Sequence, residues 1–158
     1  MPISTIIVFI LLAFVAITIF KGVRIVPQGY KWIVQRLGKY HTTLQPGLNF
    51  VIPYVDEVAY KVTTKDIVLD IPSQEVITRD NAVLLMNAVA YINLTTPEKA
   101  VYGIENYSWA IQNMVQTSLR SIVGEMDLDD ALSSRDHIKA KLKAAISDDI
   151  SDWGITLK

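Results

Sequence analysis

An apolar run of 18 residues near the N-terminus constrains this chain more than any other feature. Residues 3–20 contain 15 apolar side chains, interrupted only by Ser4, Thr5 and Thr18. A helix over this run is about 27 Å long, close to the roughly 30 Å hydrocarbon core of a bilayer. The run therefore predicts a membrane anchor over residues 1–22. We expect its anchoring side chains to include Ile6, Phe9, Leu12, Phe14, Ile17 and Phe20.

A cleaved signal peptide is the competing interpretation of this run. Such peptides have a basic residue before the apolar stretch and a pair of small residues at its end. Here no Lys or Arg precedes the run, and Ile19, Phe20 and Lys21 stand at its end. We therefore expect the anchor to be retained.

The charges divide unevenly along the chain, although the 158 residues sum to a net charge of −1. Residues 1–55 contain five basic and no acidic side chains, and the remainder has 10 basic and 16 acidic ones. The positive-inside rule then predicts a single-pass protein with its N-terminus outside and the rest cytoplasmic. We expect the membrane to be the inner (plasma) membrane of the cell. Lys21, Arg24 and Lys31 are candidates for contact with anionic lipid head groups, or they serve only to set this orientation.

A second apolar stretch lies at residues 48–55, which carry no charge and are interrupted at Pro53. One interpretation is a buried strand that ends at the proline, because proline cannot donate to a sheet. The other is a shallow dip into the membrane interface through Leu48, Phe50 and Ile52, since the stretch is too short to span a bilayer. Residues 40–47 before it, with two threonines and a Pro-Gly pair, are expected to form a loop.

Alternation of apolar and polar residues predicts strands in the rest of the chain. The strongest signal covers residues 82–94, where every even position from Leu84 to Leu94 is apolar. One face of this strand should belong to a core while the other is half exposed. Weaker strand signals cover residues 30–37, 57–62, 67–71 and 74–78.

Three helices are expected after these strands. Thr96 and Pro97 begin a short one, Ser108 caps a second that ends at Gly124, and Ser134 caps a third. Residues 127–130 between the last two are expected to form a turn. Strands followed by helices predict an α+β fold, with the helices packed on one face of a mostly antiparallel sheet.

The side chains needed for catalysis or metal binding are sparse. The chain has no cysteine, and neither His41 nor His137 has a second histidine at helical spacing, so zinc-site spacing is missing. No Gly-x-Ser-x-Gly turn or phosphate-binding glycine loop is present. The net charge argues against general nucleic-acid binding. We therefore expect a protein that is not an enzyme and needs no cofactor or metal.

An acidic cluster lies at the end of the third expected helix, where it opposes the helix dipole. It includes Asp148 and Asp149, and three lysines precede it at Lys139, Lys141 and Lys143. One interpretation is a solvated charged face. The other is a contact between protomers, in which the lysines of one copy meet the aspartates of the next.

Several short motifs resemble those of the SPFH superfamily, which includes stomatins, prohibitins, flotillins and the Hfl proteins. The resemblance covers residues 23–158 and is nearest to the bacterial stomatin-like branch that includes QmcA. Its motifs are Val26-Pro-Gln-Gly-Tyr30, Arg36-Leu-Gly-Lys-Tyr40, Pro46-Gly-Leu-Asn-Phe50, Gln74-Glu-Val-Ile-Thr-Arg-Asp80, Leu119-Arg120 before Gly124, Leu132-Ser133 before Arg135, and Trp153-Gly-Ile155.

The resemblance implies a non-catalytic membrane scaffold. Its copies would assemble into large homo-oligomeric rings or cages that enclose a membrane microdomain and modulate membrane-protein quality control. The implied partners are an NfeD-type membrane protein and an AAA protease of the FtsH type. It also implies a membrane-adjacent first SPFH (band 7) subdomain at residues 23–65 and a second one at residues 66–158.

Relatives in this superfamily continue past the Trp-Gly-Ile strand into a coiled coil, so we expect this sequence to be the N-terminal part of a longer polypeptide. An alternative function stays open. The part after the anchor could be a ligand-binding module of a single-pass membrane sensor.

Overall fold

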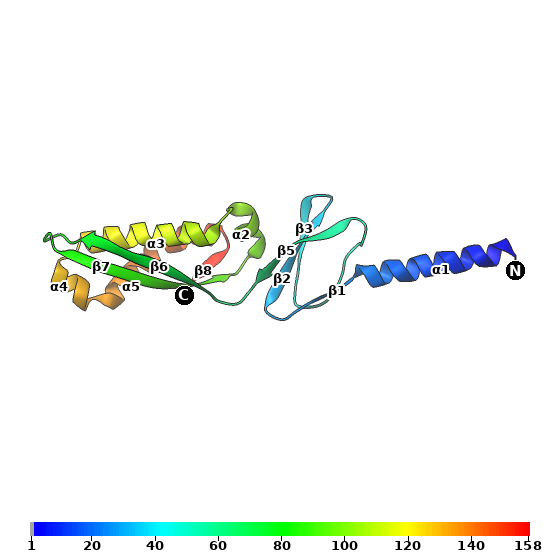
Figure 1. Cartoon of the computed structure of the whole chain (residues 1–158), viewed down its shortest axis with the longest axis horizontal. Helices are drawn as coiled ribbons and strands as arrows, with labels where there is room; N and C mark the ends of the chain where they lie inside the picture. Colours follow the sequence, from blue (N-terminus) through cyan, green and yellow to red (C-terminus); the bar gives the residue numbers. More distant parts are fainter. Residues whose placement is uncertain (1) are drawn as a thin grey trace. The chain divides into compact units, whose positions relative to one another are not determined.

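The computed structural model describes residues 2–158 and has an α+β fold (Figure 1). The chain divides into two compact units, the first ending at Thr64 and the second beginning at Lys65. Each unit has its own antiparallel strands. The helices that follow the strands all belong to the second unit.

The first unit begins with helix α1 (Ile3–Gly22). This is the one helix in the described residues that is long and apolar enough to cross a membrane. Its apolar side chains are exposed within the chain, including the six that were expected to anchor it. The helix ends at Gly22, where the chain enters the first strand.

The rest of the first unit consists of five short strands in two small sheets. These are β1 (Val23–Val26), β2 (Tyr30–Arg36), β3 (Lys39–Leu44), β4 (Gly47–Phe50) and β5 (Asp56–Thr63). β1 pairs with β4, and β2 lies between β3 and β5, all antiparallel. A small core forms around the buried side chains of Val26, Val34 and Leu44.

The sequence-based expectations for residues 40–55 were wrong in two places. Strand β3 occupies most of the segment expected to be a loop, because Leu37 and Gly38 both have positive φ and turn the chain back on β2. The stretch from 48 to 55 is not a buried strand. Only its first residues belong to β4, and Leu48 and Phe50 are exposed.

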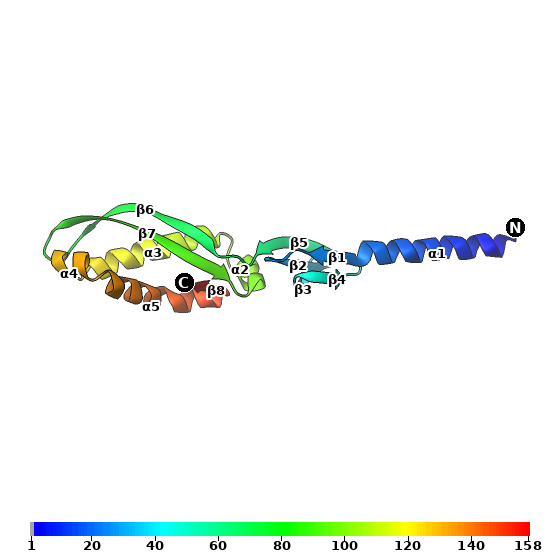
Figure 2. The same ribbon diagram turned by 90° about the horizontal axis from the view of Figure 1, so that it is seen from below.

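The second unit is a three-stranded sheet with helices on one face, as Figure 2 shows. Its strands are β6 (Ile67–Ile77), β7 (Val83–Leu94) and β8 (Ile155–Leu157), in the order β6, β7, β8. Its helices are α2 (Pro97–Gly103), α3 (Tyr107–Gly124), α4 (Leu128–Ser133) and α5 (Arg135–Asp152). The α+β prediction, with helices on one face, is confirmed.

The core of the second unit follows the predicted periodicities. The even side chains of β7 face the helices, and Ala90, Ile92 and Leu94 among them are buried. On α3 the buried side chains recur every fourth residue from Ile111 to Val123. The two patterns meet because the sheet and the helices share one apolar layer.

Three local features of the second unit differ from the predictions. β6 is one strand, in which the pairing with β7 shifts between Ile71 and Gln74, so the two expected strands are joined by a bulge. Residues 128–133 form the short helix α4 rather than part of a turn. The side chain that caps α3 belongs to Asn106, which accepts a hydrogen bond from the Trp109 amide, and not to Ser108.

Candidate functional site

Exposed apolar side chains gather next to the end of α1. Ile25, Leu48, Phe50, Ile52 and Tyr54 are each at least half exposed, and Phe50 reaches 71%. We call these five residues the anchor-adjacent surface. They come from β1, from β4 and from the loop that follows β4. A soluble protein rarely leaves such a set uncovered, so a partner or a lipid phase is expected there.

The pairing of β1 with β4 places part of this surface on one face. Ile25 lies directly opposite Leu48 in the register, and Val23 lies opposite Phe50. Directly paired residues project to the same side of a sheet. The ribbon of two strands therefore presents a continuous apolar face beginning at the first residues after the anchor.

The loop after β4 packs against the end of α1. The amide of Val51 donates a hydrogen bond of 2.8 Å to the carbonyl of Gly22. A Cβ atom at Gly22 would lie 2.7 Å from the Val51 carbonyl oxygen, so only glycine allows this approach. Three residues after Val51, the ring of Tyr54 stacks on the ring of Phe14, with the ring centroids 6.3 Å apart. The loop therefore reaches the part of α1 that would lie inside a bilayer.

A carboxylate fixes the shape of this loop. Asp56 accepts two hydrogen bonds from the guanidinium of Arg36, at 2.7 and 3.1 Å, and one from the amide of Ile52 at 3.0 Å. Its side chain is 3% exposed. The hydrogen bonds from Arg36 lower the pKa of Asp56 from 3.8 to about 2. The loop is thus closed by an ionised pair at neutral pH.

The basic residues expected at the head groups do not all gather near the anchor. Lys21 lies in the last turn of α1, and Arg24 on β1 lines a cavity of about 620 Å³ with Trp32 and Lys61. The Lys61 ammonium lies 4.6 Å from the centre of the Trp32 ring.

Lys31 lies apart from these residues. It is at the start of β2, opposite Val62, whereas the other end of β2 holds Arg36 beside the loop. The structure therefore brings Lys61, rather than Lys31, towards Arg24. Sequence proximity to the anchor could not show this, because β2 and β5 bring distant residues together.

The charged residues considered as protomer contacts all lie on α5 and are exposed. Among the described residues, no ion pair joins Lys139, Lys141 or Lys143 to Asp148 or Asp149. Lys139 and Lys143 line a groove beside β7, and Lys141 does not. Both charged groups are thus free to meet another molecule.

A second exposed apolar surface lies on the face of the β6–β7 sheet away from the helices. The periodicity of β7 did predict a half-exposed face, but not how apolar it is. Register pairs Val68 with Tyr91 and Ile77 with Val83 on this face. The exposed apolar side chains of this open sheet face are Val68, Ile77, Val83, Leu85, Val89 and Tyr91.

A network of polar contacts holds the β6–β7 turn to the helices. Arg79 pairs with Asp127, and its amide donates to the carbonyl of Met126 at 2.9 Å. Asp80 accepts from the hydroxyl of Thr78 and from the amide of Leu128 at the start of α4. The hydrogen bond from Thr78 is the main cause of the lowered pKa of Asp80. These acids are engaged in structure, and the described residues contain no group of acids and histidines that could hold a metal ion.

Comparison with known proteins identifies the family. Residues 24–158 match the model of the SPFH domain / Band 7 family. The chain is 38% identical over 130 residues to the human mitochondrial stomatin-like protein 2. The aligned residues make up 82% of this chain and 36% of that protein.

Two microbial relatives extend this match. The chain is 41% identical over 140 residues to an uncharacterized protein of Methanocaldococcus jannaschii, covering 89% of this chain and 70% of that one. It is 36% identical over 146 residues to an uncharacterized protein of Mycobacterium tuberculosis. The aligned residues make up 92% of this chain and 38% of that protein. The chain thus spans little more than a third of the human and mycobacterial proteins. Because the family match covers nearly all of the chain after the anchor, this protein belongs to the SPFH domain / Band 7 family.

Proposed function

We propose that this protein is a non-catalytic membrane scaffold, whose copies assemble into large closed rings or cages that enclose a membrane microdomain. Family membership and the apolar α1 support a membrane-associated scaffold role at the coarse level. The observation that carries the membrane part of this proposal is the anchor-adjacent surface. It would hold the first unit against the bilayer by a contact separate from the span.

The size of this surface suits a membrane contact. Burying a large apolar side chain gains about 1.5–3 kcal/mol, so five partly buried ones would contribute several kcal/mol per copy. Trp32 and Tyr54 line the cavity that also holds Arg24 and Lys61, and aromatic rings and cations are typical of the head-group level. Many copies would add these contacts by avidity.

The same proposal includes an orientation and a subdomain assignment. α1 would cross the inner membrane once, with the N-terminus outside and both units in the cytoplasm. The unit ending at Thr64 would be the membrane-adjacent SPFH subdomain, and the unit from Lys65 would be the second. Lys21 and Arg24 would contact anionic head groups on the cytoplasmic side.

Assembly would use the second unit, and protease control would follow from it. The open sheet face, with the charged residues of α5, offers surfaces through which copies could meet. A closed ring would limit which membrane proteins reach a quality-control protease of the FtsH type, and an NfeD-type membrane protein would be a further partner. Co-purification of either partner with the tagged chain, lost when the ring is broken, would test this part.

The decisive experiment is the size of the assembly. We expect the full chain, purified in a mild detergent, to give large closed particles by mass photometry and rings by electron microscopy. Charge reversal at Asp148 and Asp149 should reduce particle size if α5 forms the contact. A monomer or dimer would contradict the scaffold and favour the single-pass sensor.

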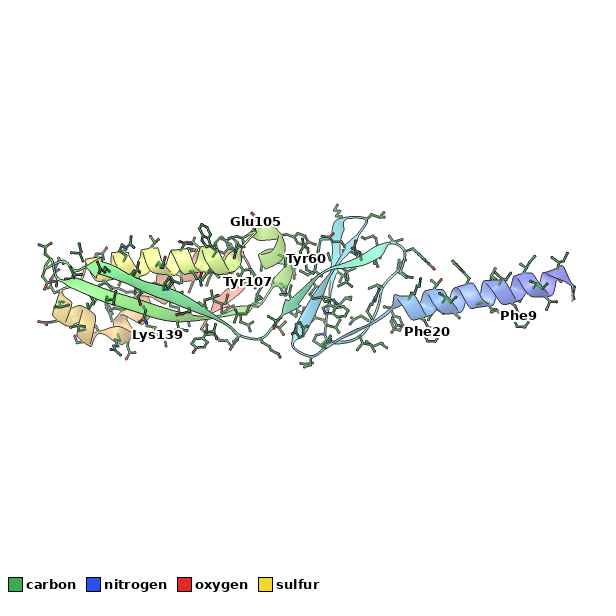
Figure 3. All side chains as sticks on the ribbon, viewed as in Figure 1. Phe9, Phe20, Tyr60, Glu105, Tyr107 and Lys139 are labelled. Carbon is green, nitrogen blue, oxygen red and sulfur yellow. The ribbon has the colours of Figure 1, made fainter. Side chains whose placement is uncertain are left out.

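A labelling experiment tests the membrane contact. The chain has no cysteine, so a single introduced cysteine is unique. A fluorophore on Phe50→Cys in nanodiscs should be quenched by brominated lipids. The matched control is Tyr60→Cys on β5, which Figure 3 labels on the side of this unit away from α1. Equal quenching at both positions would contradict the proposed contact.

The orientation has its own test. A cysteine at Tyr40, on the exposed part of β3, should react with a membrane-impermeant maleimide only after cells are lysed. Reaction in intact cells would place the first unit outside.

A further inference from the structure

The cavity of about 620 Å³ lies within the first unit. Every residue of its lining lies between positions 24 and 61, so this unit builds the whole cavity. Arg24 of β1 lines it together with Trp32 of β2 and Lys61 of β5. The rest of its wall comes from the β2–β3 turn and from the loop after β4, including Leu37 and Tyr54. Both small sheets of the unit therefore contribute to it.

The pairing of β2 with β5 places one cation in this cavity. Val58 pairs with Val34 and Lys61 pairs with Trp32, and paired residues project to the same side of a sheet. A bulge in this pairing supplies an extra residue between Val58 and Lys61. A regular strand would present Tyr60 on this face instead. The bulge thus puts a lysine on the face that also holds the buried Val34.

The other sheet supplies a second cation. Arg24 is the second residue after α1, and on β1 it shares a face with Val26. Val26 belongs to the small core of the unit, so this is the inward face of the ribbon formed by β1 and β4. Ile25, on the opposite face, belongs to the anchor-adjacent surface. The cavity thus receives one cation from each sheet.

The charges of the lining favour an anionic ligand. Asp56 is neutralised by the two hydrogen bonds that it accepts from Arg36, and Glu57 is exposed. Neither Arg24 nor Lys61 forms an ion pair with another described residue. Two cations in one cavity without a counter-ion suit a phosphate, which guanidinium and ammonium groups both bind well.

A cationic head group does not suit this cavity. Quaternary ammonium groups bind to proteins over the faces of aromatic rings. The Lys61 ammonium lies 4.6 Å from the centre of the Trp32 ring. A choline group approaching this ring would therefore meet a charge of its own sign.

The opening of the cavity is apolar. Leu37 is 84% exposed and Tyr54 is 60% exposed, and both line the cavity, so they lie at its rim. Leu37 has a φ of +51°, which is uncommon for this residue type, and its amide donates to the Val55 carbonyl at 3.3 Å. Tyr54 stacks on Phe14 of the anchor. Acyl chains would cover such a rim, whereas a soluble phosphate would leave it in water.

We propose that this cavity binds the head group of one anionic phospholipid, whose phosphate is held by Arg24 and Lys61. The acyl chains leave past Leu37 and Tyr54 into the bilayer beside α1. This inference rests on the membrane contact proposed above. It goes further, because it assigns a single bound lipid of stated charge rather than contact with a lipid surface.

Native mass spectrometry of the full chain in a mild detergent tests the proposal. The probes are phosphatidylglycerol and phosphatidylcholine with identical acyl chains, and glycerol 3-phosphate, which carries a phosphate without acyl chains. We expect phosphatidylglycerol to bind at least tenfold more tightly than either of the others. Equal binding of the two lipids would overturn the proposal. Equal binding of glycerol 3-phosphate would indicate a site for soluble phosphate esters and overturn the lipid assignment.

Charge variants test the assigned residues. Arg24 and Lys61 are exposed, so the double variant Arg24→Gln with Lys61→Gln should fold, with an unchanged circular dichroism spectrum. It should weaken binding of phosphatidylglycerol at least tenfold. Lys31→Gln with Lys39→Gln removes the same charge from the same unit outside the cavity lining, and it should change binding less than twofold. An equal loss in both would show a general charge effect and overturn the cavity assignment.

Leu37→Asn tests the rim independently of charge. Asn adopts a positive φ more readily than Leu, so the turn should be kept. The variant should weaken binding of phosphatidylglycerol at least threefold, because acyl chains lose an apolar contact. Unchanged binding would show that the chains do not pass this rim, and the proposed path of the lipid would be overturned.

Failure of this inference can be distinguished from failure of the membrane contact. Selective quenching of the fluorophore on Phe50→Cys, together with no preference for phosphatidylglycerol, would overturn the cavity assignment alone. Equal quenching at Phe50→Cys and Tyr60→Cys, together with tight binding of phosphatidylglycerol in detergent, would support the lipid site and contradict the wider contact.

Discussion

The two units of this chain bury their apolar residues in different ways. In the second unit, α3 and α5 cover one face of the sheet, and the core forms around side chains from strand and helix such as Val76, Leu119 and Ile138. Among the described residues of the first unit no helix covers the strands, and the buried cluster is small. Several of its largest apolar side chains, among them Phe50 and Leu48, are exposed beside α1.

This difference indicates that the two units are adapted to different surroundings. A sheet in water must cover its apolar face with another layer. The first unit leaves such a face uncovered next to a helix long enough to span a membrane. If lipid covers that face, then substitutions should act on stability in the second unit and on membrane contact in the first. The following predictions test this division, from the largest effect to the smallest.

The largest effect on stability is expected at Gly154, between α5 and β8. Its φ is +68°, and a Cβ atom there would lie 2.6 Å from the Thr96 carbonyl oxygen. That carbonyl belongs to backbone, which cannot move aside cheaply, because the amides of Thr95 and Thr96 both donate to the Gly154 carbonyl. Gly154→Ala should lower the free energy of unfolding by about 3 kcal/mol or more, measured by urea unfolding in detergent.

Gly103 gives the matched control for this prediction. Its φ is ordinary, and a Cβ atom there would meet only the Trp153 side chain at 3.6 Å. Gly103→Ala should change the free energy of unfolding by less than about 1 kcal/mol, since the new contact is normal. Equal effects of the two substitutions would show that the backbone at Gly154 adapts.

The next effect concerns Asp56 in the first unit. Asp56→Asn removes the charge that accepts two hydrogen bonds from Arg36, and it should destabilise this unit by about 2 kcal/mol. The exposed neighbour Glu57 supplies the control Glu57→Gln, which should have little effect. Hydrogen exchange read by mass spectrometry would locate the loss. Faster exchange in residues 51–63 is expected for Asp56→Asn, and faster exchange only beyond Lys65 would contradict it.

Acid should act on the same pair. The folded pKa of Asp56 is about 2, below its ordinary value of 3.8. A carboxyl whose pKa is lowered by folding stabilises the fold at every pH above its ordinary pKa. This contribution is lost as the pH falls from about 3.8 to about 2. The stability of the wild type should therefore decrease over that range more steeply than that of Asp56→Asn. Parallel pH profiles would show that Asp56 does not titrate with unfolding.

The second unit could largely be predicted from sequence because its signals are local. The even-numbered apolar residues of β7 and the stripe on α3 follow from periods of 2 and 3.6 residues, and the structure confirms both. The caps were less predictable. The amide of Leu128 at the start of α4 donates a hydrogen bond to Asp80, which lies 48 residues earlier in the chain. No local sequence pattern indicates such a partner.

The first unit was harder to predict because its apolar residues do not mark a core. The uncharged stretch from 48 to 55 has the composition of a buried strand, yet Phe50 is 71% exposed. Composition alone cannot distinguish burial in protein from burial in lipid. The clamp between Arg36 and Asp56 also joins residues 20 positions apart. The resemblance to SPFH proteins supplied the family, which the match over residues 24–158 confirms.

A smaller effect is expected where α3 meets β6. The side-chain amide of Gln74 donates to the Gln116 carbonyl at 3.0 Å, and its oxygen accepts from Arg120 at 2.9 Å. Gln74→Ala should lower the stability of the second unit by about 1 kcal/mol. Glu75→Ala, at the adjacent exposed position, is the control and should have a smaller effect. A larger loss of stability for Glu75→Ala than for Gln74→Ala would contradict a stabilising role of the Gln74 hydrogen bonds.

The smallest effect on stability, and the sharpest test of the comparison, concerns two leucines. Leu48 of the first unit is 62% exposed and Leu85 of the second is 67% exposed, and both lie on strands. Replacing either by Asn should change the free energy of unfolding in detergent by less than about 0.5 kcal/mol, since neither is in a core. In nanodiscs, Leu48→Asn should reduce the quenching of a fluorophore on Phe50→Cys by brominated lipids, because it weakens the contact of the ribbon with lipid. Leu85→Asn should leave that quenching unchanged. Equal behaviour of the two variants would mean that the exposed apolar residues of the first unit are not specialised for lipid, and the distinction between the two units would fail.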